Sequence, residues 1–172
     1  MTPEDKRIIL ELVHAPGKPP SATQEDILQH FGTRDGKTLG LKLLRNATER
    51  RDAADIEYAM IVSSVFGFDL DHLDLLRQLS TSDWHYKHED VVSALGELKT
   101  PAAVDALYNA TQWIPEYLEF DDSRALATKA IWALGGTPGP EAEQALNRLL
   151  ESDDEILRES SEKQLERRRN KK

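Results

Sequence analysis

The chain has 172 residues, a formal net charge of −9 and no cysteine. This length suits one packed domain better than two, and the lack of cysteine excludes a disulfide framework and thiolate metal sites. The start, MTPEDKRIILELVHAPG, lacks the pattern of a signal peptide, and no apolar stretch reaches the length of about 18 residues that a membrane span needs. We therefore expect a soluble, cytoplasmic protein with no membrane partner.

The charges are segregated along the chain. Residues 1–51 contain nine Lys/Arg and seven Asp/Glu, whereas residues 52–162 contain seven Lys/Arg and twenty-three Asp/Glu, a net of −16. The last ten residues are basic again, with six Lys/Arg and one Asp/Glu. An acidic middle repels phosphate backbones and favours a basic partner, although acidity can also serve solubility alone. We do not expect nucleic acid as a partner.

Start and stop signals for helices divide the first half of the chain. Thr2 before Pro3 predicts a helix that runs to about His14, where APGKPP ends it. A second helix is expected from Thr23 to Phe31.

Three further helices are expected before residue 80. The third continues to about Arg51, and Asp52 can cap the fourth, which Gly67 ends. The fifth is expected from about Leu70 to Leu79, with leucines along one stripe.

The second half of the chain contains an internal repeat. The segment ALGELKTPAAVDAL, residues 94–107, recurs as ALGGTPGPEAEQAL, residues 133–146, with seven of fourteen positions identical at a shift of thirty-nine. The shared glycine, Gly96 or Gly135, is expected at the tight end of a first helix, and the shared proline in the first turn of the next. Each repeat is therefore a predicted helical hairpin.

One hairpin cannot bury both of its faces, so neighbouring hairpins must stack, and a period near forty residues is typical of HEAT-type stacks. The predicted fold is all-α, an α-solenoid of about five stacked antiparallel helical hairpins with a right-handed superhelix. We expect a single domain, residues 1–172. Its predicted parts are an N-terminal helical cap (1–51), a first hairpin (52–82), HEAT-like repeats (83–165) and a basic tail (166–172).

Asp83–Leu165 resembles the bacterial HEAT-like repeats that are named after phycobilisome lyases, and SDDEILRESSEKQL resembles their usual ending. This resemblance implies the fold. It implies less about function, because the repeat occurs in lyases, scaffolds and inhibitors.

A narrower resemblance extends from Asp55 through Gly135. The segments DIEYAMIVSSVFGF, SDWHYKHEDVVSAL and WIPEYLEFDDSRALATKAIWALG are similar to small bacterial HEAT-repeat immunity proteins, which are encoded beside polymorphic or contact-dependent toxins. The resemblance implies a protein that binds and blocks one cognate toxin.

The run WHYKHED, residues 84–90, is the densest cluster of functional side chains. If it is helical, His85 and Glu89 lie four apart on one face, as ligands of a divalent metal could, with His88 three beyond His85. The pattern lacks a third strong ligand. We favour the alternative, in which Trp84 packs between hairpins, a histidine hydrogen-bonds a neighbouring loop, and the acids support the start of a helix.

A long link, residues 112–122, alternates aromatic and acidic residues. Aromatic anchors in a charged rim are typical of partner sites, but these aromatics could equally turn inward to cover the stack. The two features together give the predicted partner-binding residues: Trp84, His85, Trp113, Glu116, Tyr117, Glu119, Asp121 and Asp122. Phe120 is a further anchor of the link.

The sequence favours binding over catalysis. It has no G-x-S-x-G elbow and no phosphate-binding glycine loop, and a HEAT-fold DNA glycosylase would need a basic groove. We expect no enzyme, no cofactor and no metal, but an immunity protein whose partner is a cognate, basic protein toxin. The alternatives are a lyase relative that binds a tetrapyrrole, a metal-dependent hydrolase built on His85, His88 and Glu89, and an assembly scaffold.

Overall fold

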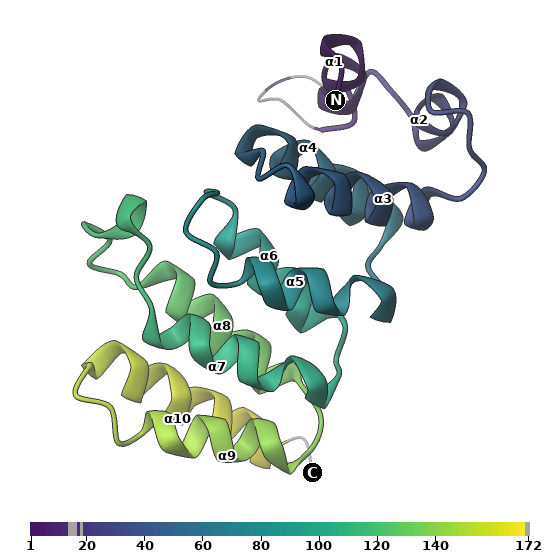
Figure 1. The fold of residues 1–172 in the computed structure, drawn as a ribbon. Coiled ribbons are helices and arrows are strands. Elements are labelled where there is room, and N and C mark those ends of the chain that lie inside the picture. The colour runs from purple at the N-terminus through teal and green to yellow at the C-terminus, as the bar shows by residue number, and fades with distance from the viewer. Residues whose placement is uncertain (14–16, 18, 171–172) are drawn as a thin grey trace. The chain divides into compact units, whose positions relative to one another are not determined.

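The computed structural model describes residues 1–13, 17 and 19–170, and these residues form helices and turns without a strand. The expected all-α class is therefore confirmed over the described residues. The chain divides into two compact units, Met1–Leu75 and Leu76–Lys172, which are described separately (Figure 1). No helix among the described residues is long and apolar enough to cross a membrane.

The described residues of the first unit form four complete α-helices and one 3-10 turn. They are α1 (Pro3–Leu10), α2 (Gln24–His30), α3 (Gly36–Glu49), α4 (Ala53–Phe66) and η1 (Leu70–His72). Thr2 and Thr23 form capping boxes at the starts of α1 and α2, and Asp52 caps α4, which Gly67 ends as predicted. The predicted fifth helix is divided into η1 and α5 (Leu73–Leu79), which spans the boundary between the units.

The first helix ends sooner than predicted, at Leu10. The carbonyl of Glu11 accepts hydrogen bonds from the backbone of Ser21 and Ala22, at 2.9 and 3.0 Å, so the returning chain takes the acceptor that a longer helix would use. The predicted end at His14 lies outside the described residues.

The core of the first unit combines an apolar cluster with a buried carboxylate. Buried residues from four helices meet there: Ile9, Ile27, Leu39 and Val62. Asp55, also buried, forms ion pairs with Lys6, Arg50 and the N-terminal ammonium. Burial raises the pKa of Asp55, but the hydrogen bonds from these cations outweigh it and hold the pKa well below its ordinary value.

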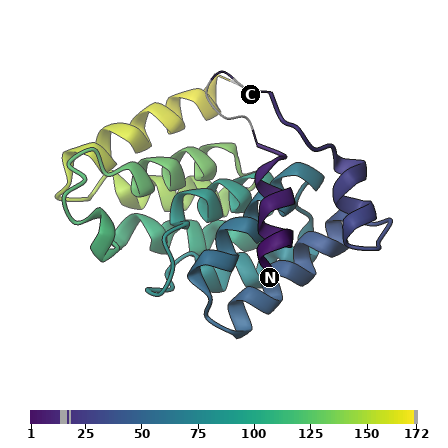
Figure 2. The ribbon, with the colours of Figure 1, turned by 90° about the horizontal axis from the view of Figure 1, so that it is seen from above.

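The second unit consists of helices in two packed rows. Its elements are α6 (His88–Glu97), η2 (Pro101–Ala103), α7 (Val104–Gln112), η3 (Glu116–Leu118), α8 (Ala125–Gly136), α9 (Pro140–Leu149) and α10 (Glu155–Arg169). Helix α8 packs against α6 on one side and α10 on the other, while α7 contacts α8 and α9 contacts α10 (Figures 1 and 2). Pro101 and Pro140 stand in first turns, as predicted.

The repeated glycines lie at the ends of their helices, as predicted, and they also allow close helix packing. Each glycine is the last but one residue of its helix, Gly96 in α6 and Gly135 in α8. A Cβ on Gly96 would lie 2.7 Å from the Cβ of Ala133, so this glycine lets α6 and α8 approach closely. Gly135 does the same toward Gln164 of α10. The backbone of Lys99, shortly after the end of α6, has the left-handed conformation, with a φ of 47°.

Candidate functional site

Two loops of the second unit lie together beside the starts of α6 and α8. The first, residues 80–87, joins α5 to α6, and the second, residues 113–124, joins α7 to α8 (Figure 1). A hydrogen bond of 2.9 Å between His88 Nδ1 and the Tyr117 hydroxyl connects them. The two sequence features that suggested a partner site are therefore parts of one site.

A stacked pair of buried histidines forms the base of this site. The rings of His85 and His88 lie 4.1 Å apart between centroids with an interplanar angle of 19°. His88 is the first residue of α6, but His85 precedes the helix. The helical spacing of His85 and Glu89 that a metal site would need is therefore absent. Among the described residues, no group of three or more His, Asp or Glu is arranged to hold a metal ion.

Every ring nitrogen of this pair has a hydrogen-bond partner. His85 donates from Nε2 to the Leu79 carbonyl (2.9 Å) and accepts at Nδ1 from the Lys87 backbone (3.1 Å). His88 donates from Nε2 to the Ser82 carbonyl (2.7 Å), which leaves Nδ1 as the acceptor for the Tyr117 hydroxyl. The contacts assign both rings as neutral Nε2–H tautomers.

The environment favours these neutral forms. Burial, and then the neighbouring charge of His88, lower the pKa of His85 to about 4, although the bond to Leu79 acts in the opposite direction. Burial also lowers the pKa of His88 and raises that of the Tyr117 hydroxyl. The pair is therefore uncharged near neutral pH and acts as a structural base for the two loops.

Aromatic rings from both loops pack around the histidines. Trp113 meets the His88 ring edge to face at 4.9 Å, and Tyr117 stacks on it at 5.6 Å. Trp84 meets His85 at 5.3 Å, and Tyr86 meets Tyr117 at 5.3 Å. Some of the aromatic residues thus point inward and others outward. Trp113 packs on the buried histidine pair, whereas Tyr117 extends from that pair to the surface.

The predicted site residues differ in exposure. His85 is 1 % exposed, so it supports the loops and does not present a surface to a partner. Trp84 and Trp113 are half-buried, whereas Tyr117 and the acids Glu116, Glu119 and Asp122 are exposed.

Asp121 also has a local structural role. Its carboxylate accepts hydrogen bonds from the backbone of Ser123 (3.1 Å) and of Ala125 (2.6 Å), which is the first residue of α8. Hydrogen bonding, first from the Ser123 side chain, lowers the pKa of Asp121. This carboxylate therefore orders the loop ahead of α8.

Three exposed apolar side chains complete the surface. Phe120 is 91 % exposed and Tyr86 67 %, and Ile114 is also exposed. Tyr86 and Ile114 have no sequence signal that separates them from their neighbours, because only the paired loops decide which side chains face outward. We use "loop surface" for Tyr86, Ile114, Tyr117 and Phe120 together with Glu116, Glu119 and Asp122.

Comparison with known families identifies the repeat. Residues 89–112, which lie in α6, η2 and α7, match the family model of the PBS lyase HEAT-like repeat. This match covers one stretch of the second unit and supports a HEAT-like repeat there. His88 immediately precedes the matched residues, and the second loop directly follows them. Neither curated proteins nor solved structures gave a match to the chain.

Proposed function

We propose that this chain is a protein-binding module of the HEAT-repeat kind, and that it serves as an immunity protein for one cognate bacterial toxin. Protein–protein interaction is the common role of HEAT-like repeats, and residues 89–112 match such a repeat. The loop surface is the observation that supports the proposal most directly. It combines exposed aromatic anchors with an acidic rim on a base of buried, hydrogen-bonded rings.

The charge of the loop surface indicates the kind of partner. Residues 113–122 contain four acids and no Lys or Arg. Such a surface attracts a cationic partner over roughly the Debye length, about 8–10 Å at physiological salt, which speeds encounter and disfavours acidic competitors. A toxin whose substrate cleft is lined by Lys and Arg fits this requirement. The proposed mechanism is occlusion: the acids meet the cationic cleft while the aromatic side chains anchor the complex.

The proposal includes a cellular and an architectural part. We place the protein in the bacterial cytoplasm, where an immunity protein meets an incoming toxin. The architecture that we propose is a solenoid of stacked hairpins with a right-handed superhelix, in which the loops at the hairpin ends form the binding edge.

The test is affinity capture of the tagged chain from its native cells, followed by mass spectrometry and metal analysis of the eluate. We expect one stoichiometric basic partner whose gene lies next to that of the chain. Several partners would instead indicate an assembly scaffold. A monomer that carries metal or pigment would replace the proposal with an enzyme or a lyase relative.

A pair of matched variants connects the capture to the site. The loop variant neutralises three exposed acids of the loop surface: Glu116→Gln, Glu119→Gln and Asp122→Asn. The control variant removes the same charge from three exposed acids elsewhere in the second unit: Glu151→Gln, Asp153→Asn and Glu162→Gln. We expect the loop variant to lose at least tenfold in affinity and the control to retain it. Equal affinity of the two variants would move the binding site away from the loops.

A further inference from the structure

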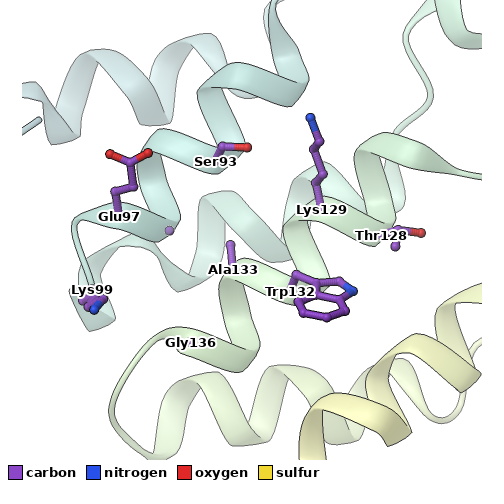
Figure 3. A pocket seen from close by; sticks show the side chains of 9 residues that line it. Ser93, Glu97, Lys99, Thr128, Lys129, Trp132, Ala133 and Gly136 are labelled. Carbon is purple, nitrogen blue, oxygen red and sulfur yellow. The ribbon is translucent and has the colours of Figure 1, made fainter. Parts of the chain in front are cut away.

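A hollow of about 610 Å³ lies between α6 and α8 of the second unit (Figure 3). Small residues of both helices, Gly96, Ala133 and Gly136, line it, and Trp132 projects from α8 beside them. Trp132 is 55 % exposed, which is unusual for the largest apolar side chain. We use "groove" for this hollow and its lining residues.

The groove has a cationic rim, although the chain as a whole is acidic. Lys99 and Lys129 line it, and the guanidinium of Arg167 lies over the Trp132 ring, 4.5 Å from the centroid. Lys129 also pairs with Glu89 at 3.0 Å, and Glu97 is the acidic residue of the lining. An aromatic face among three cations suits an anionic segment that carries a ring of its own.

The loop surface has the complementary composition. Phe120 is its most exposed side chain, and Glu119, Asp121 and Asp122 flank it in the sequence. Because Phe120 and Trp132 are both exposed within one chain, they do not cover each other there. A second copy of the chain can supply the missing partner for each.

We propose that this protein associates with itself, with Phe120 of one copy entering the groove of another and stacking on Trp132. Acids beside Phe120 meet Lys99, Lys129 and Arg167, so apolar contact and charge complementarity act together. The proposed contact is heterologous: it joins two different surfaces and is made once between any two copies. Each copy keeps an unused groove or loop, and association extends beyond two copies. This contact uses the same loop surface as the proposed toxin contact, but its test does not require the toxin.

The experiment measures the molar mass of the purified full chain over a range of concentrations by sedimentation equilibrium. We expect the wild-type mass to rise with concentration beyond that of two copies, and to fall when salt is raised from about 0.05 to about 0.5 M, because salt screens the charged rim. A single-copy mass at every concentration up to about 1 mM would overturn the proposal.

Two variants isolate the contact. Phe120→Ala removes the anchor and leaves the groove, whereas Trp132→Ala alters the groove and leaves the anchor. Each alone is expected to weaken association at least tenfold, while Leu70→Ala, which removes another exposed apolar side chain, changes nothing. An equal mixture of the two variants should form complexes of two copies and no more, since only one productive contact remains between them.

A charge variant covers the case in which an aromatic variant fails to fold. Lys129→Glu keeps both rings and is expected to weaken association at least tenfold, with an unchanged circular dichroism spectrum. Self-association that survives both Phe120→Ala and Lys129→Glu would show that another surface holds the copies together, and the assignment of groove and loop would be wrong.

Discussion

Acidification is expected to destabilise the second unit through its buried histidine pair. An unfolded histidine titrates near pH 6.5, whereas the pKa of folded His85 is lowered to about 4. Between these two values the unfolded chain binds a proton that the folded chain rejects. This contribution to stability is therefore complete above pH 6.5 and is lost as pH falls toward 4.

The size of the stability loss follows from the difference between the unfolded and folded pKa values of His85. A difference of roughly 2.5 pH units, at about 1.4 kcal/mol each, corresponds to a loss of about 3 kcal/mol, of which about 2 kcal/mol is lost by pH 5. The lowered pKa of His88 acts in the same direction. The whole stability of a domain is about 5–15 kcal/mol, so the effect is large enough to measure.

Urea unfolding followed by tryptophan fluorescence at pH 7 and pH 5 measures the loss, since Trp84 and Trp113 both contact the pair. His85→Asn lacks the titrating ring, so its stability should fall by about 2 kcal/mol less than that of the wild type over this range. Tyr117→Phe removes a hydrogen bond but keeps both imidazoles, and should retain the loss. The same pH dependence in wild type and His85→Asn would refute the reasoning.

Three further changes are expected to alter stability, each checked by chemical unfolding. Gly96→Val should lower the free energy of unfolding by about 1–3 kcal/mol, because its side chain would meet Ala133. Its control is Gly136→Ala, where a Cβ meets nothing within 4 Å, and this change should be neutral or slightly stabilising. Similar losses for both variants would contradict the packing argument. Asp55→Asn should lower the free energy of unfolding by about 3–5 kcal/mol at pH 7, because it leaves the paired cations without a counter-charge. The difference from the wild type should shrink as pH falls below about 3.8. A difference that is constant with pH would count against this explanation. Asp121→Ala should cost about 1 kcal/mol by removing the acceptor for the first backbone N–H of α8, and an unchanged stability would assign that carboxylate to another role.

Local signals predicted most of the helices correctly, because their causes lie within a few residues. The cap at Asp52 and the stop at Gly67 fix α4 in this way. The early end of α1 depends on the backbone of Ser21 and Ala22, which returns from ten residues farther along the chain. The spacing of apolar residues cannot predict a hydrogen bond from a later segment of the chain.

The site was predictable in composition but not in assembly. The aromatic and acidic residues of both loops could be found from the sequence, but the hydrogen bond between His88 and Tyr117 joins positions twenty-nine residues apart. The role of Gly96 likewise required the neighbouring helix, since its requirement for a small side chain is set by Ala133. The groove beside Trp132 is lined by the same Gly96 and Ala133, and no sequence motif marks it.

At Lys99, the residue type that best suits the backbone differs from the one that best suits the proposed self-association. Its left-handed conformation costs a non-glycine residue about 1–2 kcal/mol, which exceeds the roughly 0.5–1 kcal/mol of backbone entropy that glycine would add. Lys99→Gly would therefore make a slightly more stable fold, but it would also remove a cation from the groove rim. Selection for thermal robustness alone would thus remove this lysine, and the proposed contact between copies would be weakened along with it.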